Sequence, residues 1–205
     1  MEHRMRVCAS VIITFALIAF LRVPLPAQAV KMTERFTAST MNMASRETLK
    51  IDVLRWSADV DRDGLTAAIG QSEDACLKAL QAAPTVGYIW PPGSLGYSLH
   101  YAFRAAMPDG SERVVLATDR RLGEWNKNGW KLNPPISATN TEFTVIELRV
   151  SRAGLGEGKM SLATRVVADP ESKTIALDDY KSAPVLLTGV RRVGAATAAK
   201  GTTGR

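Results

Sequence analysis

One stretch of the 205-residue chain, residues 96–121 with the sequence GYSLHYAFRAAMPDGSERVVLATDRR, limits the fold more than any other. Its first half alternates apolar and polar residues, which is typical of a half-buried β-strand, and its second half is rich in Val and Leu. Pro108-Asp109-Gly110 lies between the halves and favours a tight turn, because proline presets φ and glycine accepts a positive φ. The stretch therefore predicts a long antiparallel β-hairpin.

Two registers are open for this hairpin, and they give different neighbours to His100, the only histidine after residue 3. A two-residue turn at Asp109 and Gly110 places His100 opposite Asp119, whereas a three-residue turn with a bulge places it opposite Thr118. Proline at the first loop position favours the three-residue turn. That register also pairs apolar residues across the hairpin, Tyr101 with Ala117 and Phe103 with Val115.

Nine strands are predicted from short apolar or alternating runs between turn residues. They cover residues 35–43, 48–56, 86–90, 96–104, 113–119, 142–151, 159–168, 174–177 and 184–193. Two helices are predicted between the second and third strands, one capped by Ser57 and ending at Gly70, the other opening at Ser72 and ending at Pro84. The expected fold class is α+β: mainly antiparallel β, with about nine strands in a curved sheet or partial barrel and a two-helix insertion after the second strand.

The first 29 residues have the layout of a secretory signal peptide. Arg4 and Arg6 precede an apolar run over residues 7–21, and Ala27-Gln28-Ala29 is a small-residue cleavage pattern. The run is shorter than the roughly 20 residues that span a bilayer, so we expect cleavage, a periplasmic or extracellular location and no stable membrane span afterwards. Residues 30–193 then form one β-rich domain, and residues 194–205, which lack large apolar side chains, form a disordered tail.

The net charge of +6 comes from the two ends of the chain. Residues 30–190 carry equal numbers of acidic and basic side chains, so nothing indicates the basic face that binding to a phosphate backbone requires. We therefore expect no nucleic-acid partner. Cys76 is the one cysteine beyond the signal segment, and its place on the apolar stripe of the second predicted helix indicates a core residue.

Asp59, Asp61 and Asp63 match the opening of a calcium loop, D-x-D-x-D-G. The twelfth position of such a loop needs a bidentate carboxylate, and here it is Gly70. The preferred interpretation is a helix start in which the acids complement the helix dipole, and no metal site is predicted. The glycines at 154, 156 and 158 lead into a predicted strand, which excludes phosphate-binding loops, and we expect no cofactor.

Residues 122–141 are predicted to be a long irregular connection, and loops of this length are functional or mobile. Trp125 and Trp130 in it are binding candidates, either as an exposed aromatic pair at a binding mouth or as residues that fold back over the domain. Asp119-Arg120-Arg121 precedes the connection. Arg120 is a further binding candidate, in an anion-binding or ion-pairing cluster, and the alternative is a group of solvated charges at a strand end.

Six short strings resemble a family of uncharacterised exported bacterial proteins, a domain of unknown function. They are RWS (55–57), VGYI (86–89), LHYA (99–102), ATDR (117–120), FTVIEL (143–148) and GEGKMSLAT (156–164). Together they span nearly the whole mature chain except its tail. The resemblance implies secretion and one shared domain, and it implies no activity or substrate.

These observations support three hypotheses about function. The leading one is a non-enzymatic secreted or periplasmic module that binds a small apolar ligand or an envelope component, because curved sheets and small barrels commonly hold ligands at their mouths. The second is a hydrolase-like enzyme in which His100 works with a carboxylate, Asp119 or Glu147. The third is a structural or assembly protein of the cell envelope that acts through a sheet edge.

Overall fold

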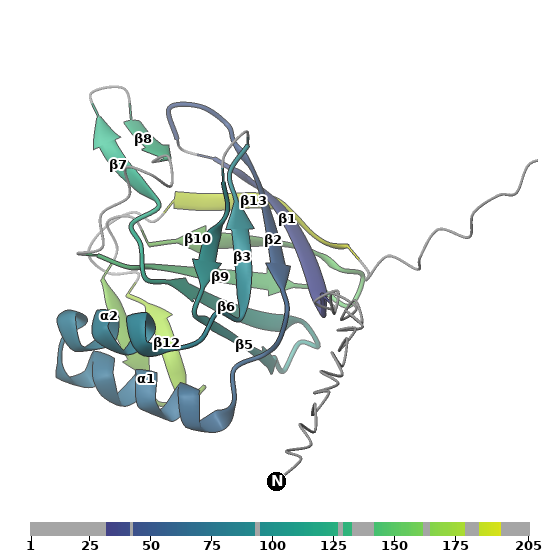
Figure 1. Ribbon diagram of the computed structural model, residues 1–205. Helices are drawn as coiled ribbons and strands as arrows, with labels where there is room; N and C mark the ends of the chain where they lie inside the picture. The colour runs from purple at the N-terminus through teal and green to yellow at the C-terminus, as the bar shows by residue number, and fades with distance from the viewer. Residues whose placement is uncertain are drawn as a thin grey trace, which may run out of the picture.

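A nine-stranded antiparallel sheet, curled until its two ends meet, is the centre of the computed structural model (Figure 1). The structure describes residues 32–41, 43–92, 95–126, 129–132, 142–161, 165–178 and 185–193, so the predicted signal peptide and tail lie outside it. The sheet contains β1 (Glu34–Thr40), β2 (Thr48–Val53), β3 (Gly87–Trp90), β4 (Tyr97–Leu99), β5 (Tyr101–Ala106), β6 (Glu112–Thr118), β9 (Thr144–Val150), β10 (Leu155–Met160) and β13 (Val185–Val193). The expected fold class, including the two helices after the second strand, is confirmed.

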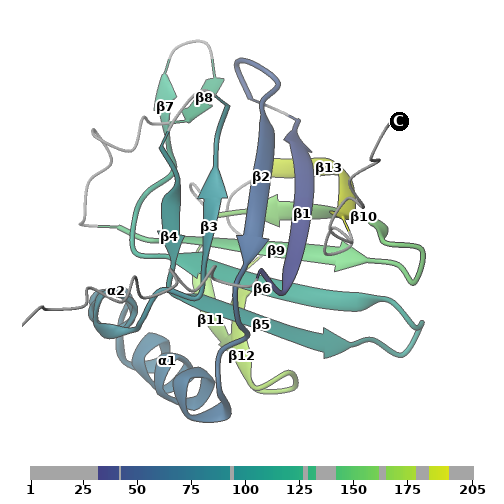
Figure 2. The same ribbon diagram turned by 45° about the vertical axis from the view of Figure 1, so that its right-hand side comes forward.

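The order of the strands explains how the sheet closes. It runs β4-β3-β2-β1-β13-β10-β9-β6-β5, so the strands at the two ends are consecutive in the chain and only His100 separates them. The His100 amide donates to the Ala117 carbonyl at 2.9 Å, which joins this junction to β6. The sheet is therefore a nearly closed barrel (Figure 2), and this near-closure shortens the free edges that strands otherwise expose.

The predicted hairpin is present in the three-residue register. Tyr101 lies opposite Ala117, the Met107 amide donates to the Ser111 carbonyl at 2.8 Å, and Gly110 has φ of 79°. The prediction of one continuous first arm is wrong, because the arm breaks at His100. Its two pieces, β4 and β5, pair with β3 and β6 respectively, and the break lets the chain pass from one end of the sheet to the other.

The interior of the barrel is filled by one face of each strand. Alternate residues point inward, so the buried side chains include Phe36 on β1, Ile51 on β2, Leu116 on β6 and Leu148 on β9. Gly156 and Gly158 on β10 also face inward, where β9 approaches closely. A Cβ at Gly156 would lie 1.9 Å from the Arg149 carbonyl oxygen.

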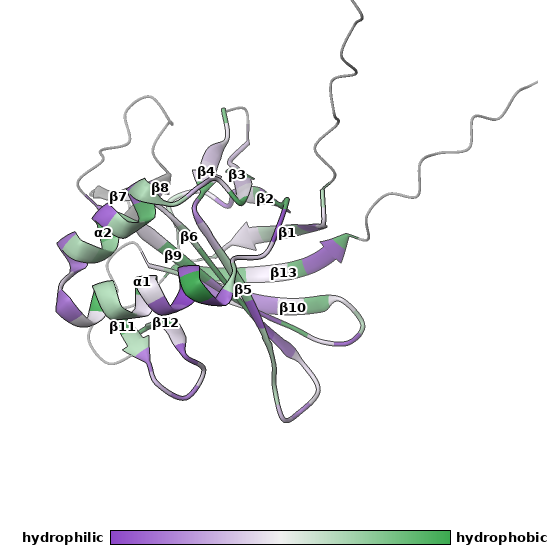
Figure 3. Ribbon diagram, turned by 60° about the horizontal axis from the view of Figure 1, so that its bottom comes forward, coloured by the Kyte–Doolittle hydropathy of each residue, from purple (hydrophilic) through white to green (hydrophobic). Residues whose placement is uncertain are grey.

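A second core lies outside the barrel, against β5, β6 and β9. It is covered by α1 (Asp59–Gln71), α2 (Glu73–Ala82) and the hairpin of β11 (Val166–Asp169) and β12 (Thr174–Leu177), which gather on one side in Figure 3. Val115 and Ala117 on β6 face this outer core, while Val114 and Leu116 face the barrel interior. The Val-rich arm of the hairpin is thus buried on both faces. No helix among the described residues has the length and apolarity to cross a bilayer.

Several predicted boundaries are corrected by the structure. Ala58, not Ser57, precedes α1, because the Ser57 hydroxyl accepts from the Ala102 amide and so anchors the chain to β5. The first helix continues through Gly70, while Ser72 caps α2 as predicted, accepting from the Ala75 amide at 3.0 Å. The predicted strand over 159–168 is two strands, β10 and β11, and the connection over 122–141 contains the hairpin of β7 (Gly123–Asn126) and β8 (Gly129–Leu132).

Ion pairs close one end of the barrel. Glu34, Arg104, Glu112 and Arg192 each lie two residues beyond an inward-facing core residue, so they point into the same end. Glu34 accepts from Arg104 at 2.7 Å and pairs with Arg192 at 3.2 Å, and Arg192 also binds Glu112. Two acids and two arginines therefore balance one another above the Phe36 ring, over which the Arg192 guanidinium lies.

Substitution of Gly156 by alanine tests the close approach of β10 to β9. Because the new Cβ would meet backbone rather than a movable side chain, we expect Gly156→Ala to lower the free energy of unfolding by at least about 2 kcal/mol in urea titrations. A Cβ added at Gly64 in α1 would meet no neighbouring atom within 4 Å, and Gly64→Ala should instead raise stability by roughly 0.5–1 kcal/mol. Equal stabilities of the two variants would contradict the argument.

Candidate functional site

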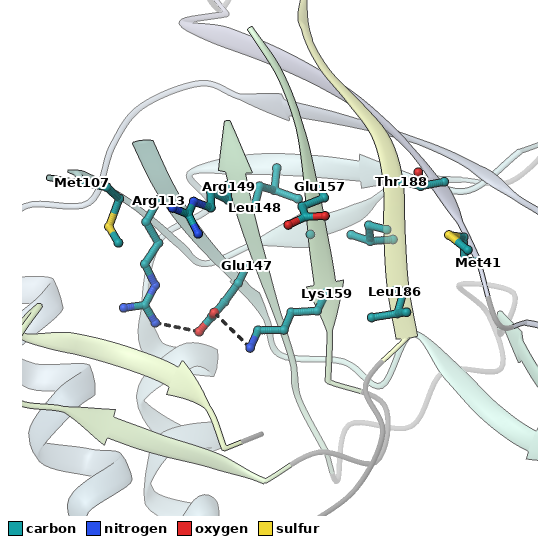
Figure 4. Close-up of a pocket in the computed structure, with 12 residues that line it drawn as sticks. Met41, Met107, Arg113, Glu147, Leu148, Arg149, Glu157, Lys159, Leu186 and Thr188 are labelled. Carbon is teal, nitrogen blue, oxygen red and sulfur yellow. Dashed lines mark hydrogen bonds and ion pairs between the residues drawn. The ribbon is translucent and has the colours of Figure 1, made fainter. Parts of the chain in front are cut away.

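A groove of about 450 Å³ crosses the outer face of the sheet where the covering hairpin β11–β12 ends (Figure 4). Its floor is formed by outward-facing residues of β6, β9, β10 and β13, four strands that are neighbours in the barrel. The residues that line it include Arg113, Glu147, Arg149, Glu157, Lys159, Leu186, Thr188, Met41 and Met107. Charged residues gather at the β6 end of the groove, where Met107 also lies, and the exposed aliphatic side chains of Leu186 and Met41 lie at the β13 end.

Arg113 and Glu147 organise the polar end of the groove. The guanidinium of Arg113 donates to Glu147 Oε1 at 2.8 Å and to Asp169 Oδ2 at 2.6 Å. Glu147 Oε1 also accepts from the Leu177 amide at 2.9 Å, and Lys159 Nζ lies 3.9 Å from Glu147 Oε2. These contacts hold the β11–β12 hairpin on the sheet, so the hairpin forms a fixed wall of the groove.

The pKa of Asp169 shows that this network stabilises the ionised form of the carboxylate. Burial by itself would raise the pKa of Asp169, but hydrogen bonds from Arg113 and Ser172 outweigh burial and hold the pKa below its ordinary range. The carboxylate thus stays ionised beside Arg113. Because most of its members are paired with one another, the polar end presents a nearly neutral set of charges to a ligand.

The apolar end is formed by Leu186 on β13 and by Met41, which directly follows β1. Leu186 is opposite Lys159 across the β10–β13 ladder, and its carbonyl accepts from the Met41 amide at 2.7 Å. The two side chains are 43% and 46% exposed. Large apolar side chains exposed next to a groove are candidates for contact with a ligand.

His100, the histidine candidate, lies at the junction of β4 and β5 and is close to Asp119. Its Nδ1 is 2.8 Å from the Ala83 carbonyl oxygen and its Nε2 is 3.5 Å from Asp119 Oδ1. A carbonyl only accepts, so Nδ1 carries a proton and donates it to Ala83. The bond from Nδ1 favours a structural tie between the end of α2 and the barrel junction, and the other ring nitrogen faces Asp119. A second pocket, of about 290 Å³, lies beside this ring, between the helices and β5.

Glu147, the other carboxylate proposed to work with His100, is engaged by Arg113 and the Leu177 amide instead. The structure therefore divides the candidate catalytic pair between two places. His100 and Asp119 meet at the barrel junction, and Glu147 belongs to the outer groove.

The three calcium candidates lie in a helix rather than in a loop. Asp59, Asp61 and Asp63 occupy the first residues of α1. Asp61 accepts from the Ala58 amide at 3.1 Å and so caps the helix, while Asp59 and Asp63 pair with Arg62 at 3.1 and 3.3 Å. Residues two apart on a helix point in different directions, and the described residues contain no cluster of metal-ligating side chains.

The tryptophan candidates lie opposite one another in the β7–β8 hairpin, where Trp125 pairs with Trp130, although their side chains are outside the described part of the structure. Arg120 has its Nε 3.9 Å from Asp119 Oδ1. Arg121 donates to the Gly123 carbonyl at 2.8 Å and to Glu142 at 2.9 Å. Arg121 thus ties the end of β6 to Glu142, just before β9, while Arg120 pairs with its chain neighbour.

Cys76 is fully buried in the outer core, as predicted, and burial raises its pKa to about 12.

Comparison of the chain with models of protein families, with curated proteins and with solved structures found no match. The candidate site is therefore defined by geometry alone.

Removal of the Asp169 charge tests how much the ion pair with Arg113 stabilises the fold at the polar end of the groove. A depressed carboxyl pKa stabilises the fold above the ordinary pKa of about 3.9, and this stabilisation is lost as pH falls through the lower folded value. We expect Asp169→Asn to cost about 1.5 kcal/mol at pH 7, with the difference from wild type constant above about pH 5 and shrinking below about pH 4. Urea unfolding over a range of acidic to neutral pH measures it, with Asp74→Asn on the exposed face of α2 as control. A difference that does not change with pH would contradict the assignment.

Two substitutions at His100 test whether its ring is a structural tie. The side-chain amide introduced by His100→Asn can still donate to Ala83, so this variant should lose less than about 1 kcal/mol of stability. His100→Leu removes the donor and should lose roughly 1–3 kcal/mol. Thermal and urea unfolding measure both variants, and equal losses would show that the bond to Ala83 contributes little.

Proposed function

We propose that the protein is a non-enzymatic binding module of the cell envelope, and that a small, uncharged ligand with an apolar part occupies the outer groove. The N-terminal pattern and the resemblance to exported bacterial proteins support an envelope location. Membership of that family is part of the proposal.

The observation that carries the proposal is the division of the groove into two ends. At the polar end, Arg113 is held between Glu147 and Asp169, and Lys159 lies near Glu147. A charged ligand there would have to compete with existing ion pairs, whereas an uncharged polar group needs only to accept or donate hydrogen bonds at the rim. At the other end, the exposed surfaces of Leu186 and Met41 gain about 25 cal/mol per Å² when an apolar group covers them.

The barrel interior supports the choice of an outer site. Large side chains such as Phe36, Ile51, Leu116 and Leu148 fill it, and the ion pairs of Glu34 and Arg192 close one end. The proposed ligand therefore lies on the outside of the barrel. The sequence led us to expect a ligand at the mouth of the barrel, and the proposed site is instead the groove between the sheet and its covering hairpin.

A hydrolase-like enzyme is the second candidate, and the approach of His100 to Asp119 beside a small pocket favours it. A general base needs a ring nitrogen that can take a proton from the substrate. Here one nitrogen donates to Ala83 and the other faces Asp119. The groove is the stronger proposal because its exposed apolar surface is available to a ligand.

Native mass spectrometry tests the binding module. Protein exported to a bacterial periplasm and purified without detergent should carry an adduct that leaves on denaturation. Leu186→Arg should lose most of the adduct, because it places a charge where the apolar part of the ligand lies. Leu95→Arg, at an exposed site outside the groove, should keep it.

A bare monomer mass for the wild type would overturn the proposal. A mass at a multiple of the monomer, again without an adduct, would favour the assembly hypothesis instead. Retention of the adduct by Leu186→Arg would show that the ligand binds elsewhere.

A further inference from the structure

Exposed aliphatic side chains gather on one part of the barrel surface. Among the described residues, six large apolar side chains are strongly exposed, and four of them lie on β10, on β13 or just after β1: Met41, Leu155, Leu186 and Val193. Leu155 and Val193 are 52% and 42% exposed and lie outside the groove. We call the outer surface of β10, β13 and β1 the β13 face.

Each of the three strand residues in this group has a basic residue directly opposite on the neighbouring strand. Val193 pairs with Arg35, Leu155 with Arg191, and Leu186 with Lys159. Aliphatic and cationic side chains therefore alternate across the β13 face, and Lys50 on β2 continues its basic edge.

The cations of this face outnumber its acids. Asp52 is buried and opposes two of them: Arg35 binds it through two hydrogen bonds of 2.5 and 2.7 Å, and Lys50 Nζ lies 3.9 Å from its Oδ2. Glu147 on β9 is balanced by Arg113, and Glu157 is the exposed acid of β10. Arg35, Lys50, Lys159 and Arg191 therefore face two acids, Asp52 and Glu157. The β13 face is consequently basic, although the domain as a whole is neutral.

The compensating acids lie on the opposite side of the molecule. The two helices carry Asp59, Asp61, Asp63, Glu73 and Asp74 against two basic residues, Arg62 and Lys78. They pack near β5, and in the ring of nine strands β1 and β13 are each four strands away from β5. Figure 3 shows the helices and β13 on opposite sides. The positive and negative charges of the domain therefore lie on different sides. Near an anionic surface, electrostatic attraction would orient the domain with its β13 face toward that surface.

We propose that the β13 face docks the protein on the surface of an anionic lipid bilayer. The excess positive charge of this face, carried by Arg191 and by Arg35 and Lys50, which share Asp52, would attract lipid phosphates. Leu155 and Val193 would insert among the headgroups, as apolar residues of peripheral proteins do. An acidic polysaccharide would match the charges but would leave the aliphatic side chains in water, so the lipid surface fits both features. The outer groove opens on the same side, which makes lipids accessible to it, but docking does not require an occupied groove.

Vesicle co-sedimentation tests the docking. The mature full chain is mixed with vesicles of phosphatidylcholine alone or with about 30% phosphatidylglycerol, at roughly 50 and 500 mM NaCl. We expect binding to the anionic vesicles at low salt, at least about tenfold weaker binding to the neutral ones, and a similar loss at high salt, because screening removes the charge attraction.

A pair of double variants tests the surface itself. Leu155→Glu with Val193→Glu should weaken binding to anionic vesicles by about tenfold or more. Val60→Glu with Ala67→Glu adds the same charge on the exposed face of α1 and should bind like the wild type. Circular dichroism checks that both variants are folded.

Absence of wild-type binding to anionic vesicles, or equal binding of the two double variants, would overturn docking. So would sedimentation that soluble dextran sulfate abolishes but that neither double variant changes, since it would indicate a purely ionic contact. Because Leu155 and Val193 lie outside the groove, the first double variant should keep the adduct seen by native mass spectrometry. Loss of vesicle binding with the adduct retained would therefore separate docking from the proposed function.

Discussion

Closure of the nine-stranded sheet at His100 is the constraint on which the other features of the domain depend. The strands at the two ends of the sheet, β4 and β5, are a single stretch of chain bent at this residue. The bend gives the barrel an inside that side chains fill. It also gives the sheet an outer face, of which only one part is apolar enough to be buried under other elements. The hydrogen bond from His100 Nδ1 to the Ala83 carbonyl ties the end of α2 to this bend.

The outer face is divided by what packs on it. Over β5 and β6 the helices and the β11–β12 hairpin bury residues such as Val115 and Ala117, and over β10 and β13 no described element covers the sheet. Arg113 and Glu147 lie at the border between the two regions, where they fasten the hairpin to the sheet. The groove exists because the cover ends there. The same border separates the acidic side of the domain from its basic, aliphatic side.

The candidate residues taken from the sequence were of rare or patterned types: one of the two histidines, two of the four tryptophans and a triplet of aspartates. Asp59, Asp61 and Asp63 proved to belong to a helix start. The groove residues come from four strands and look locally like ordinary alternation, so no short motif marks them. One weak signal was available: β13 has two outward aliphatic residues, Leu186 and Val193, and grouped exposed apolar side chains mark interaction surfaces.

Local chemistry in the sequence determined the turn at Gly110, the cap at Ser72, the alternation of the strands and the insertion of two helices, because each depends on residues close together in the chain. Only the tertiary structure decided the break at His100, since that bend follows from which strands pair across the barrel. It also decided that Gly156 lies inside β10, paired with β9, which approaches it too closely for a side chain. The basic β13 face also depends on the tertiary structure. Acids elsewhere in the sequence balance its cations in number, but the fold places many of those acids on the helices, away from this face.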